Sequence, residues 1–198
     1  MTKLQNPKYF DVIDTEAKAY WLGFLYADGG VTERRLSINL KETDREHIER
    51  FQQAIGSTHK IYPTTKGTCA RVDISSTELV RDLRRHGIMP NKTLTLMPPV
   101  GLDENLEPAF IRGYWDGDGS IGFYGNYQQL QITAVGTEAM VRWISDRLPA
   151  PSYVSVNGGL HRVRSTTKNA KKNLDYLYGD CYIALHRKLD LYVKAMNQ

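Results

Sequence analysis

The 198-residue sequence has few of the features that mark secreted, membrane or metal-thiolate proteins. It contains only two cysteines, Cys69 and Cys181, which are too few for a disulfide framework and lack CxxC spacing. No apolar run approaches the roughly 20 residues that span a membrane. The N-terminal region carries acidic residues at Asp11, Asp14 and Glu16, unlike a signal or transit peptide. We therefore expect an intracellular protein, in the cytoplasm, the nucleoid or an organelle of its host.

The sequence also lacks a strong excess of either charge and any clustered metal ligands. Lys and Arg together number 26 against 22 Asp and Glu, and a net charge of +4 favours a nucleic-acid partner only slightly. The five histidines have no metal-ligand spacing. Because 41% of the residues are hydrophobic, the chain can bury one good core or two small fused cores.

What the sequence does contain is an internal repeat. Residues 19–29 read AYWLGFLYADG, and residues 109–119 read AFIRGYWDGDG. In register, the alanine at the start, one glycine in the middle and the final Asp-Gly coincide in both copies. The chain is therefore predicted to contain two copies of one unit, related by a pseudo-twofold axis.

Each repeat predicts a helix that packs against its counterpart. The apolar run before each Asp-Gly is long enough for about three helical turns. Small residues recur at i, i+4 on one face, as Gly23 and Ala27 in one copy and Gly113 and Gly117 in the other. Two such faces can approach backbone to backbone. We expect the glycine after each helix to adopt the left-handed conformation of a helix cap.

This packing would bring the acids Asp28 and Asp118 to neighbouring helix ends. A carboxylate at a helix C-terminus opposes the helix macrodipole by roughly 0.3 to 1 kcal/mol. A second carboxylate nearby adds repulsion, which raises one of the two pKa values. A purely structural role is therefore unfavourable, and a divalent cation would compensate. Carboxylates, water and phosphate oxygens are the ligands that Mg²⁺ prefers.

The two stretches resemble the paired signature helices of the LAGLIDADG homing endonucleases, in the single-chain form that carries both copies. Against the nine-letter motif, residues 21–29 read WLGFLYADG and residues 111–119 read IRGYWDGDG. The third-position glycine, the eighth-position aspartate and the final glycine match in both copies, and the seventh position is small in each. The resemblance extends over roughly residues 15–195.

Short alternating segments predict half-buried strands in both halves. In residues 35–41, for example, Leu36, Ile38 and Leu40 fall on one face and polar residues on the other. Any antiparallel sheet alternates in this way, so one such segment indicates only a solvated face. Five segments beside an acid pair favour DNA contact instead. The candidate DNA-binding residues are Arg35, Ser37, Asn39, Lys41, Lys66, Arg71, Asp73, Gln129, Gln131, Thr133, Ser155, Asn157, Arg162 and Arg164.

Predicted helices lie between these strands at matched places. In the first half they cover residues 43–55, where Thr43 and Glu46 form a possible capping box, and residues 76–86. Their counterparts are residues 137–148 and 168–178. Residues 97–108, which include Pro98 and Pro99, are predicted to link an N-terminal half (1–96) to a C-terminal half (109–198).

The order of elements fits the αββαββα half of the family that the sequence resembles. The resemblance implies an α+β fold of two pseudo-symmetric halves, whose antiparallel sheets form a saddle along the DNA major groove. It also implies that Asp28 and Asp118, with backbone carbonyls near Ala27 and Gly117, hold Mg²⁺, with Mn²⁺ or Ca²⁺ able to occupy the same sites. Scissile phosphates would complete the coordination shells.

Hydrolysis of a phosphodiester also requires charge neutralisation and a positioned water. Lys92 and Lys188 follow the third helix of each half, where similar segments in the family carry a lysine. The resemblance implies that they are catalytic residues that orient water or stabilise developing charge. The alternatives are a contact to outer phosphates or an ordinary surface lysine, and Arg187 could replace Lys188.

Other possible sites are less consistent with the sequence. The stretch beginning at Asp116 resembles the opening of a calcium loop, but Ile121 and Tyr127 replace the glycine and glutamate that such a loop needs. In the repeat, Asp116 occupies the position that Tyr26 has in the first copy. A symmetric ligand role is therefore not expected for it, and a helix-end or interface contact is expected instead. His161 and His186 are expected to face DNA or solvent. The three tryptophans are expected in the core.

The sequence therefore predicts a monomeric, site-specific DNA endonuclease of the homing type, which cuts both strands of a long, partly asymmetric target with Mg²⁺. Two alternatives remain open. An intron RNA maturase could use the same architecture with degenerate acids, and a DNA-binding regulator could use it without catalysis. Both acids are intact in this chain, which favours cleavage.

Overall fold

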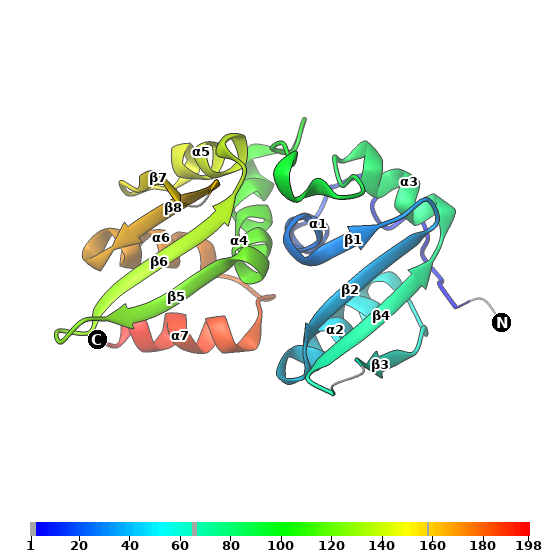
Figure 1. Cartoon of the computed structure of the whole chain (residues 1–198), viewed down its shortest axis with the longest axis horizontal. Helices are drawn as coiled ribbons and strands as arrows, with labels where there is room; N and C mark the ends of the chain where they lie inside the picture. Colours follow the sequence, from blue (N-terminus) through cyan, green and yellow to red (C-terminus); the bar gives the residue numbers. More distant parts are fainter. Residues whose placement is uncertain (1–2, 65–66, 158) are drawn as a thin grey trace.

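The computed structural model describes residues 3–64, 67–157 and 159–198, without the side chain of Asn157. Two halves of similar design lie side by side and meet along helices α1 (Glu16–Asp28) and α4 (Glu107–Asp118) (Figure 1). Each half contains one four-stranded antiparallel sheet. The predicted α+β fold with two pseudo-symmetric halves is thereby confirmed.

The first half has strand order β1-β2-β4-β3, and the second half has the equivalent order β5-β6-β8-β7. The second half ends with a further helix, α7 (His186–Met196), whereas the described part of the first half has only a three-residue 3₁₀ helix (Lys92–Leu94) at the corresponding place after α3. The remaining elements of the first half are β1 (Gly29–Val31), β2 (Arg35–Lys41), α2 (Arg45–Ile55), β3 (Ile61–Pro63), β4 (Cys69–Ser75) and α3 (Thr77–Arg85). Those of the second half are β5 (Gly119–Tyr124), β6 (Gln129–Gly136), α5 (Glu138–Arg147), β7 (Tyr153–Asn157), β8 (Leu160–Thr166) and α6 (Thr167–Tyr178).

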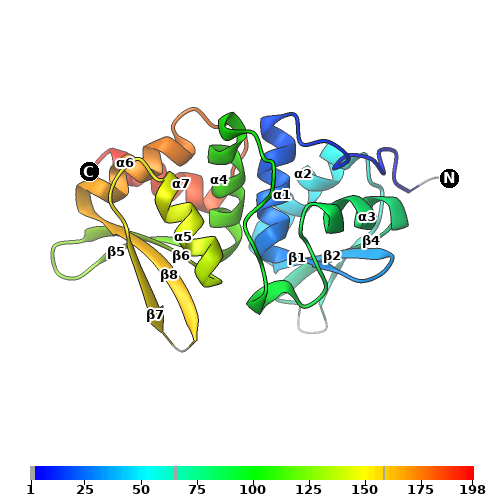
Figure 2. The ribbon, with the colours of Figure 1, turned by 90° about the horizontal axis from the view of Figure 1, so that it is seen from above.

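Helices cover one face of each sheet and leave the other face open. The apolar residues of β2 are buried, and the polar residues between them are exposed or half-buried, as the alternation predicts. In Figure 2 most of the helices lie above the two sheets, and the uncovered faces of both sheets point the same way. The chain therefore presents two similar polar surfaces on one side of the molecule.

The helices α1 and α4 touch backbone to backbone, as their small residues predict. A Cβ atom on Gly23 would lie 1.9 Å from the Phe110 carbonyl oxygen, and one on Gly113 would lie 2.0 Å from the Tyr20 carbonyl oxygen. Neither distance is possible for a real Cβ, because the clash is with backbone rather than with a flexible side chain. Glycine is therefore required at both of these repeat-related positions.

The glycines that follow the two helices do not adopt the predicted left-handed cap. Gly29 has φ −80° and ψ 129°, and Gly119 has φ −99° and ψ 170°, so both are extended. The reason is that each helix leads directly into a strand. Neither glycine has room for a side chain. A Cβ on Gly29 would lie 2.6 Å from the Leu25 carbonyl oxygen, and a Cβ on Gly119 would lie 2.4 Å from the Trp115 carbonyl oxygen.

One predicted helix start is wrong, and another is confirmed. Thr43 lies within a short 3₁₀ helix (Glu42–Asp44), and α2 begins only at Arg45 without a side-chain cap, so the capping box does not form. In contrast, the Thr137 hydroxyl accepts a 3.2 Å hydrogen bond from the Met140 amide at the start of α5. A 3₁₀ helix (Glu104–Leu106) ends the segment between the halves, and α4 follows directly.

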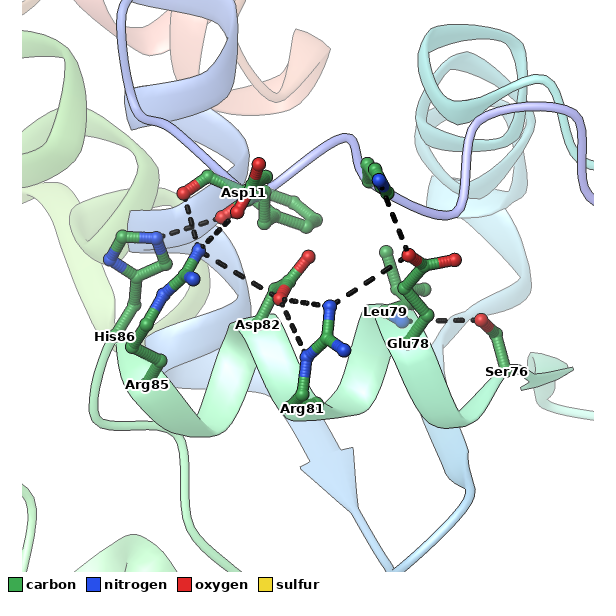
Figure 3. A network of polar contacts seen from close by, with 10 residues as sticks. Asp11, Ser76, Glu78, Leu79, Arg81, Asp82, Arg85 and His86 are labelled. Carbon is green, nitrogen blue, oxygen red and sulfur yellow. Dashed lines mark hydrogen bonds and ion pairs between the residues drawn. The ribbon is translucent and has the colours of Figure 1, made fainter.

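Helix α3 is tied to the N-terminal segment by charged side chains (Figure 3). The fully buried Asp82 contacts Arg81 at 3.2 Å and Arg85 at 3.7 Å, and Arg85 also contacts Asp11 at 2.7 Å. Ser76 caps the helix by accepting a hydrogen bond from the Leu79 amide. The network lies on the helix-covered side of the first sheet and fixes the chain that precedes α1.

Among the described residues no helix is long and apolar enough to cross a membrane. Cys69 and Cys181 are free and half-buried. Trp21 and Trp115 are fully buried, and Trp143 packs partly buried against the core, which agrees with the prediction for all three tryptophans.

Candidate functional site

The two acids of the repeat lie at the ends of the packed helices. Asp28 is the last residue of α1, and Asp118 is the last residue of α4. The Asp28 Oδ2 atom lies 3.1 Å from the point where a Cβ on Gly117 would sit, so its carboxyl abuts the end of the opposite helix. The close packing of the small residues therefore brings both acids to the junction of the two halves.

The pKa values of both acids are raised. Burial, with a smaller contribution from the charge of Asp118, raises the pKa of Asp28 to about 6. The surrounding protein atoms also raise the pKa of Asp118, although much of that residue remains accessible to solvent. The charges of Lys92 and Lys188 act in the opposite direction on both acids. The junction is thus an anionic site whose ionised form is only partly stabilised by the protein.

The two candidate lysines lie at repeat-related positions beside these acids. The Lys92 Nζ donates to the carbonyl oxygens of Ala27 at 3.2 Å and Gly29 at 2.6 Å. The Lys188 Nζ donates to the carbonyl oxygens of Asp116 at 2.6 Å, Gly119 at 2.8 Å and Trp115. Gly29 and Gly119 are equivalent in the repeat. Each lysine therefore closes the end of the helix that carries the acid of its own half.

These lysines supply part of the positive charge that the two acids need at the helix ends, so a metal ion is not the only source of it. A cation at a helix C-terminus is favourable, because it faces the unpaired carbonyls and the negative end of the macrodipole. Lys188 is 1% exposed, and the three hydrogen-bond donors of its ammonium group are matched by three carbonyl acceptors. Burial lowers its pKa to about 8 and also lowers the pKa of Lys92.

The donor set at the junction fits a hard divalent cation that keeps open coordination positions. It comprises two carboxylates and the neighbouring backbone carbonyls, all of them oxygen ligands. Among the described residues no group of three or more His, Cys, Asp or Glu side chains could enclose an ion. Phosphate and water oxygens would therefore have to complete the shell. The Ala27 carbonyl already accepts from Lys92 but retains a second lone pair.

Asp116 belongs to a buried network and is not one of these ligands. It is fully buried, and burial raises its pKa. Its carboxylate accepts hydrogen bonds from the Tyr178 hydroxyl at 2.6 Å, the Tyr20 hydroxyl at 2.7 Å and the Leu185 amide at 2.6 Å. Tyr20 also contacts His47 at 2.9 Å. The expected interface contact is confirmed, and its partners come from three separate segments that no local pattern connects.

Arg187 lies at the contact between the halves and does not take the place of Lys188. Its Nε atom is 3.0 Å and 3.2 Å from the two carboxyl oxygens of Asp44 in the first half. The neighbouring His186 is mostly exposed and lies 3.6 Å from Glu46. The charge of Arg187 nevertheless lowers the pKa of Asp28, against the larger effect of burial. The start of α7 is therefore braced against the start of α2.

The candidate DNA contacts of the first half share the open face of its sheet. Ser37 pairs with Asp73 and Asn39 with Arg71 across β2 and β4, and Arg35 and Lys41 continue the same face at the two ends of β2. Within this face Asp73 bonds to Ser37 and to Arg71, whose Nη2 atom is 3.0 Å away. Lys66 lies outside the described residues. Polar groups of this face thus already form a hydrogen-bonded set among themselves.

The candidate contacts of the second half are arranged in the same way. Thr133 pairs with Arg164 across β6 and β8, and Ser155 pairs with Arg162 across β7 and β8. Gln129 is exposed, and Gln131 is half-buried in β6. The strand β7 ends at Asn157, whose side chain lies outside the described residues. His161 does not lie on the open face: it pairs with Gly136 in the register of the helix-covered face and is half-buried, with its Nδ1 atom buried, so of the two expected contacts only the one with solvent remains.

A family model and two relatives match parts of the chain. The model of the LAGLIDADG-like domain matches residues 15–86. An uncharacterized protein of Methanocaldococcus jannaschii is 27% identical over 142 residues, which are 68% of this chain and 53% of that protein. The DNA-directed RNA polymerase subunit Rpo1C of the same organism is 30% identical over 105 residues, which are 52% of this chain and 12% of that subunit. The chain thus spans about half of one relative and a small part of the other.

Solved structures match nearly the whole chain. The LAGLIDADG meganuclease I-AabMI bound to uncleaved DNA has a TM-score of 0.67 and 14% identity, covering 90% of this chain and 89% of that one. The homing endonuclease I-LtrWI bound to target DNA has a TM-score of 0.65 and 12% identity, covering 97% and 90%. I-SmaMI bound to uncleaved DNA with calcium ions has a TM-score of 0.65 and 11% identity, covering 90% of each. These likenesses establish the fold, and with the domain match they confirm the predicted resemblance.

Proposed function

Because this chain carries a LAGLIDADG-like domain at residues 15–86 and has the two-half LAGLIDADG fold throughout, we propose that it is a site-specific DNA endonuclease of the homing type. It makes a double-strand break in a long target by metal-dependent hydrolysis of phosphodiesters. The observation that carries the proposal is the acid pair, Asp28 and Asp118, at the junction between two open polar sheet faces.

The acid pair is the proposed site of hydrolysis. Asp28, Asp118 and the neighbouring carbonyls of Ala27 and Gly117 would hold Mg²⁺, with Mn²⁺ or Ca²⁺ as possible substitutes. The ion would neutralise charge on the phosphate and activate a bound water. Lys92 and Lys188 keep the ends of α1 and α4 in place and add positive charge beside the acids. Since all three donors of Lys188 are bonded to carbonyls, its contribution is to the electrostatics of the site.

The open sheet faces are the proposed DNA-binding surface. Side chains of Arg, Lys, Gln, Asn, Ser and Thr reach both phosphates and base edges. The two faces differ in sequence, with Asn39, Lys41 and Arg71 on one and Gln131, Arg162 and Arg164 on the other. We therefore infer an asymmetric target, bound by a monomer. Each half of the chain binds one half-site, as each subunit of a symmetric dimer would. Access to such a target implies an intracellular location.

Cleavage is favoured over a role as an RNA maturase or a DNA-binding regulator by one observation. Asp28 and Asp118 are both intact and end the two packed helices, where a carboxylate pair without a cation is unfavourable for a site that only binds nucleic acid, and their raised pKa values agree with this. A pure regulator would be more stable with neutral residues at positions 28 and 118.

Selection from a randomised duplex library tests the proposal. The purified protein is incubated with the library and Mg²⁺, and cut molecules are ligated to adaptors and sequenced. We expect a long consensus with two dissimilar halves, which disappears when EDTA replaces Mg²⁺. Enrichment of bound but uncut molecules would instead identify a DNA-binding regulator, and cleavage without any consensus would remove the claim of site specificity.

A further inference from the structure

The two halves differ at one position of the repeat that lies next to the acid pair. Tyr26 in α1 and Asp116 in α4 occupy equivalent places, two residues before Asp28 and Asp118. The Tyr26 hydroxyl donates to the carbonyl oxygen of His86, at the end of α3. The Asp116 carboxylate instead accepts hydrogen bonds from three groups at once. The second half therefore has a buried carboxyl group with three hydrogen-bond partners at a position where the first has a single hydroxyl.

This carboxyl group is connected to Lys188 through the start of α7. The Asp116 Oδ2 atom accepts a 2.6 Å hydrogen bond from the amide of Leu185, the residue immediately before the helix. The Leu185 carbonyl in turn accepts a 2.9 Å bond from the Lys188 amide, so Lys188 lies in the first turn. The Asp116 carbonyl also accepts directly from the Lys188 Nζ at 2.6 Å. Asp116 thus fixes both the backbone and the ammonium group of this lysine.

The lysine of the first half is held in a different way. Lys92 begins a three-residue 3₁₀ helix (Lys92–Leu94), which follows Asn91 in the left-handed conformation at φ 56°. Its ammonium makes two hydrogen bonds to carbonyls, and its side chain remains half-buried. Lys188 makes three and is 1% exposed. The two sites of the acid pair therefore have equivalent lysines with unequal support.

We propose that Asp116, Tyr20 and Tyr178 are positioning residues for Lys188, and that through it they govern cleavage of one DNA strand but not the other. The inference rests on the proposed nuclease function for its effect on strands. Tyr20 belongs to the first half, so this site depends on a contact across the junction. Loss of the network turns an enzyme that breaks both strands into one that mainly nicks a single strand.

The first test measures the position of Lys188 without metal or DNA. The variants Tyr178→Phe and Asp116→Asn and the wild type are treated with limiting acetic anhydride, and acetylation at each lysine is quantified by mass spectrometry. We expect the acetylation rate of Lys188, relative to that of Lys92, to rise at least threefold in both variants. Equal ratios in the wild type and in the folded variants would overturn the inference.

A matched control separates this effect from a general loosening of α7. The Tyr192 hydroxyl, one turn after Lys188 in α7, donates to Asp175 of α6 at 3.0 Å, and its ring stacks on that of Tyr178, a contact that phenylalanine keeps. Tyr192→Phe therefore removes a hydroxyl–carboxylate bond of the same kind. We expect its Lys188 to Lys92 ratio to match the wild type. A rise equal to that in Tyr178→Phe would show that the ratio reports helix stability, which would also overturn the inference.

The second test follows the two strands separately. A duplex carrying the selected target is labelled on one strand or the other, and single-turnover rates are measured with Mg²⁺. We expect Tyr178→Phe to slow one strand at least tenfold more than the other, so that nicked duplex accumulates, with DNA affinity unchanged. Equal slowing of both strands would contradict the assignment. Asp116→Asn should give the same bias, and Tyr192→Phe should give none.

The two tests fail in distinguishable ways. If the wild type cuts neither strand of any selected duplex, the proposed function is wrong, and the acetylation ratio alone decides whether Asp116 positions Lys188. If the wild type cuts both strands but the acetylation ratio does not change, the function stands and the positioning role is wrong.

Discussion

The two halves are most alike where their backbones touch and least alike where they meet other parts of the chain. Gly23 and Gly113 meet the opposite helix at nearly the same distance, 1.9 Å and 2.0 Å from their hypothetical Cβ atoms. The lysine-bearing segments differ much more, because one is a three-residue 3₁₀ helix and the other begins an 11-residue α-helix. Close backbone contact constrains sequence strongly, while the support for a side chain can be built in several ways.

The same contrast holds between the acids and their surroundings. Asp28 and Asp118 end equivalent helices, and both have raised pKa values. Asp28 is half-buried, while Asp118 is more exposed, and only the second half places a buried carboxylate two residues earlier. The repeat is therefore symmetric in the groups proposed to hold metal and asymmetric in the groups that surround them.

The largest expected effect comes from neutralising either acid. Asp28→Asn and Asp118→Asn should each lower the rate of double-strand cleavage by about a thousandfold or more, because each removes a charged metal ligand. DNA binding should remain measurable in both. Cleavage rates with Mg²⁺ and binding by gel shift test this. If a variant still breaks both strands at the wild-type rate, the acid it replaces is not a metal ligand, and the two acids are not functionally equivalent.

The next largest effect, a loss of stability, is expected at the backbone contact between α1 and α4. Gly23→Ala and Gly113→Ala should each lower the free energy of unfolding by about 3 kcal/mol or more, because the added methyl group meets a backbone carbonyl oxygen that cannot move alone. Denaturant titration measures the change. Gly30→Ala is a suitable control, since its Cβ would meet nothing closer than 3.8 Å. Similar small losses in all three variants would show that α1 and α4 can move apart.

Asp28 should also make stability depend on pH without metal. Its folded pKa of about 6 lies above the unfolded value of 3.8, so the folded state binds the proton more tightly. The destabilisation is therefore absent below about pH 4 and complete above about pH 6. Asp28→Asn should raise the free energy of unfolding at pH 8 by about 1 to 3 kcal/mol, and much less at pH 4. Denaturant titrations at both pH values in EDTA test this, and a lower stability at pH 8 would contradict the pKa assignment.

The smallest effect compares one arginine from each sheet face. Arg71 is held by Asp73, whereas no described acid lies within ion-pair distance of Arg164. Arg164→Ala should weaken target binding by about 1 to 3 kcal/mol. Arg71→Ala should cost less, because Arg71 must give up an existing partner. Affinities for the target and for single-base variants test this. A loss at Arg164 that is uniform across sequences would identify a phosphate contact, and a larger loss at Arg71 would reverse the comparison.

Much of the fold could be predicted because it depends on patterns within short segments. The alternation of residues 35–41 sets the buried face of β2, and the small residues of the repeat set the packing of α1 on α4. The candidate lysines could be located as well, since Lys92 and Lys188 occupy matched places after the third helix of each half. The resemblance to the LAGLIDADG family rests on the same repeat, and its roles for individual residues stay predictions.

The errors arose where distant segments decide the outcome. Gly29 and Gly119 are extended because each helix runs directly into a strand, which a cap signal cannot show. Thr43 falls in a 3₁₀ turn instead of capping α2. His161, which is expected to contact DNA or solvent, pairs with Gly136 in the register of the helix-covered face and is half-buried there.

The sequence by itself determined the repeat, the alternation of the strands and the two acids, because periodicity and motif spacing are local properties of the chain. Only the tertiary structure decided that Asp116 lies among Tyr20, Tyr178 and Leu185, and that two lysines close the helix ends beside the acids. A hydrogen bond between residues 96 positions apart depends on how the helices cross and which faces they bury. That information belongs to the packing of the whole chain and to no single segment of it.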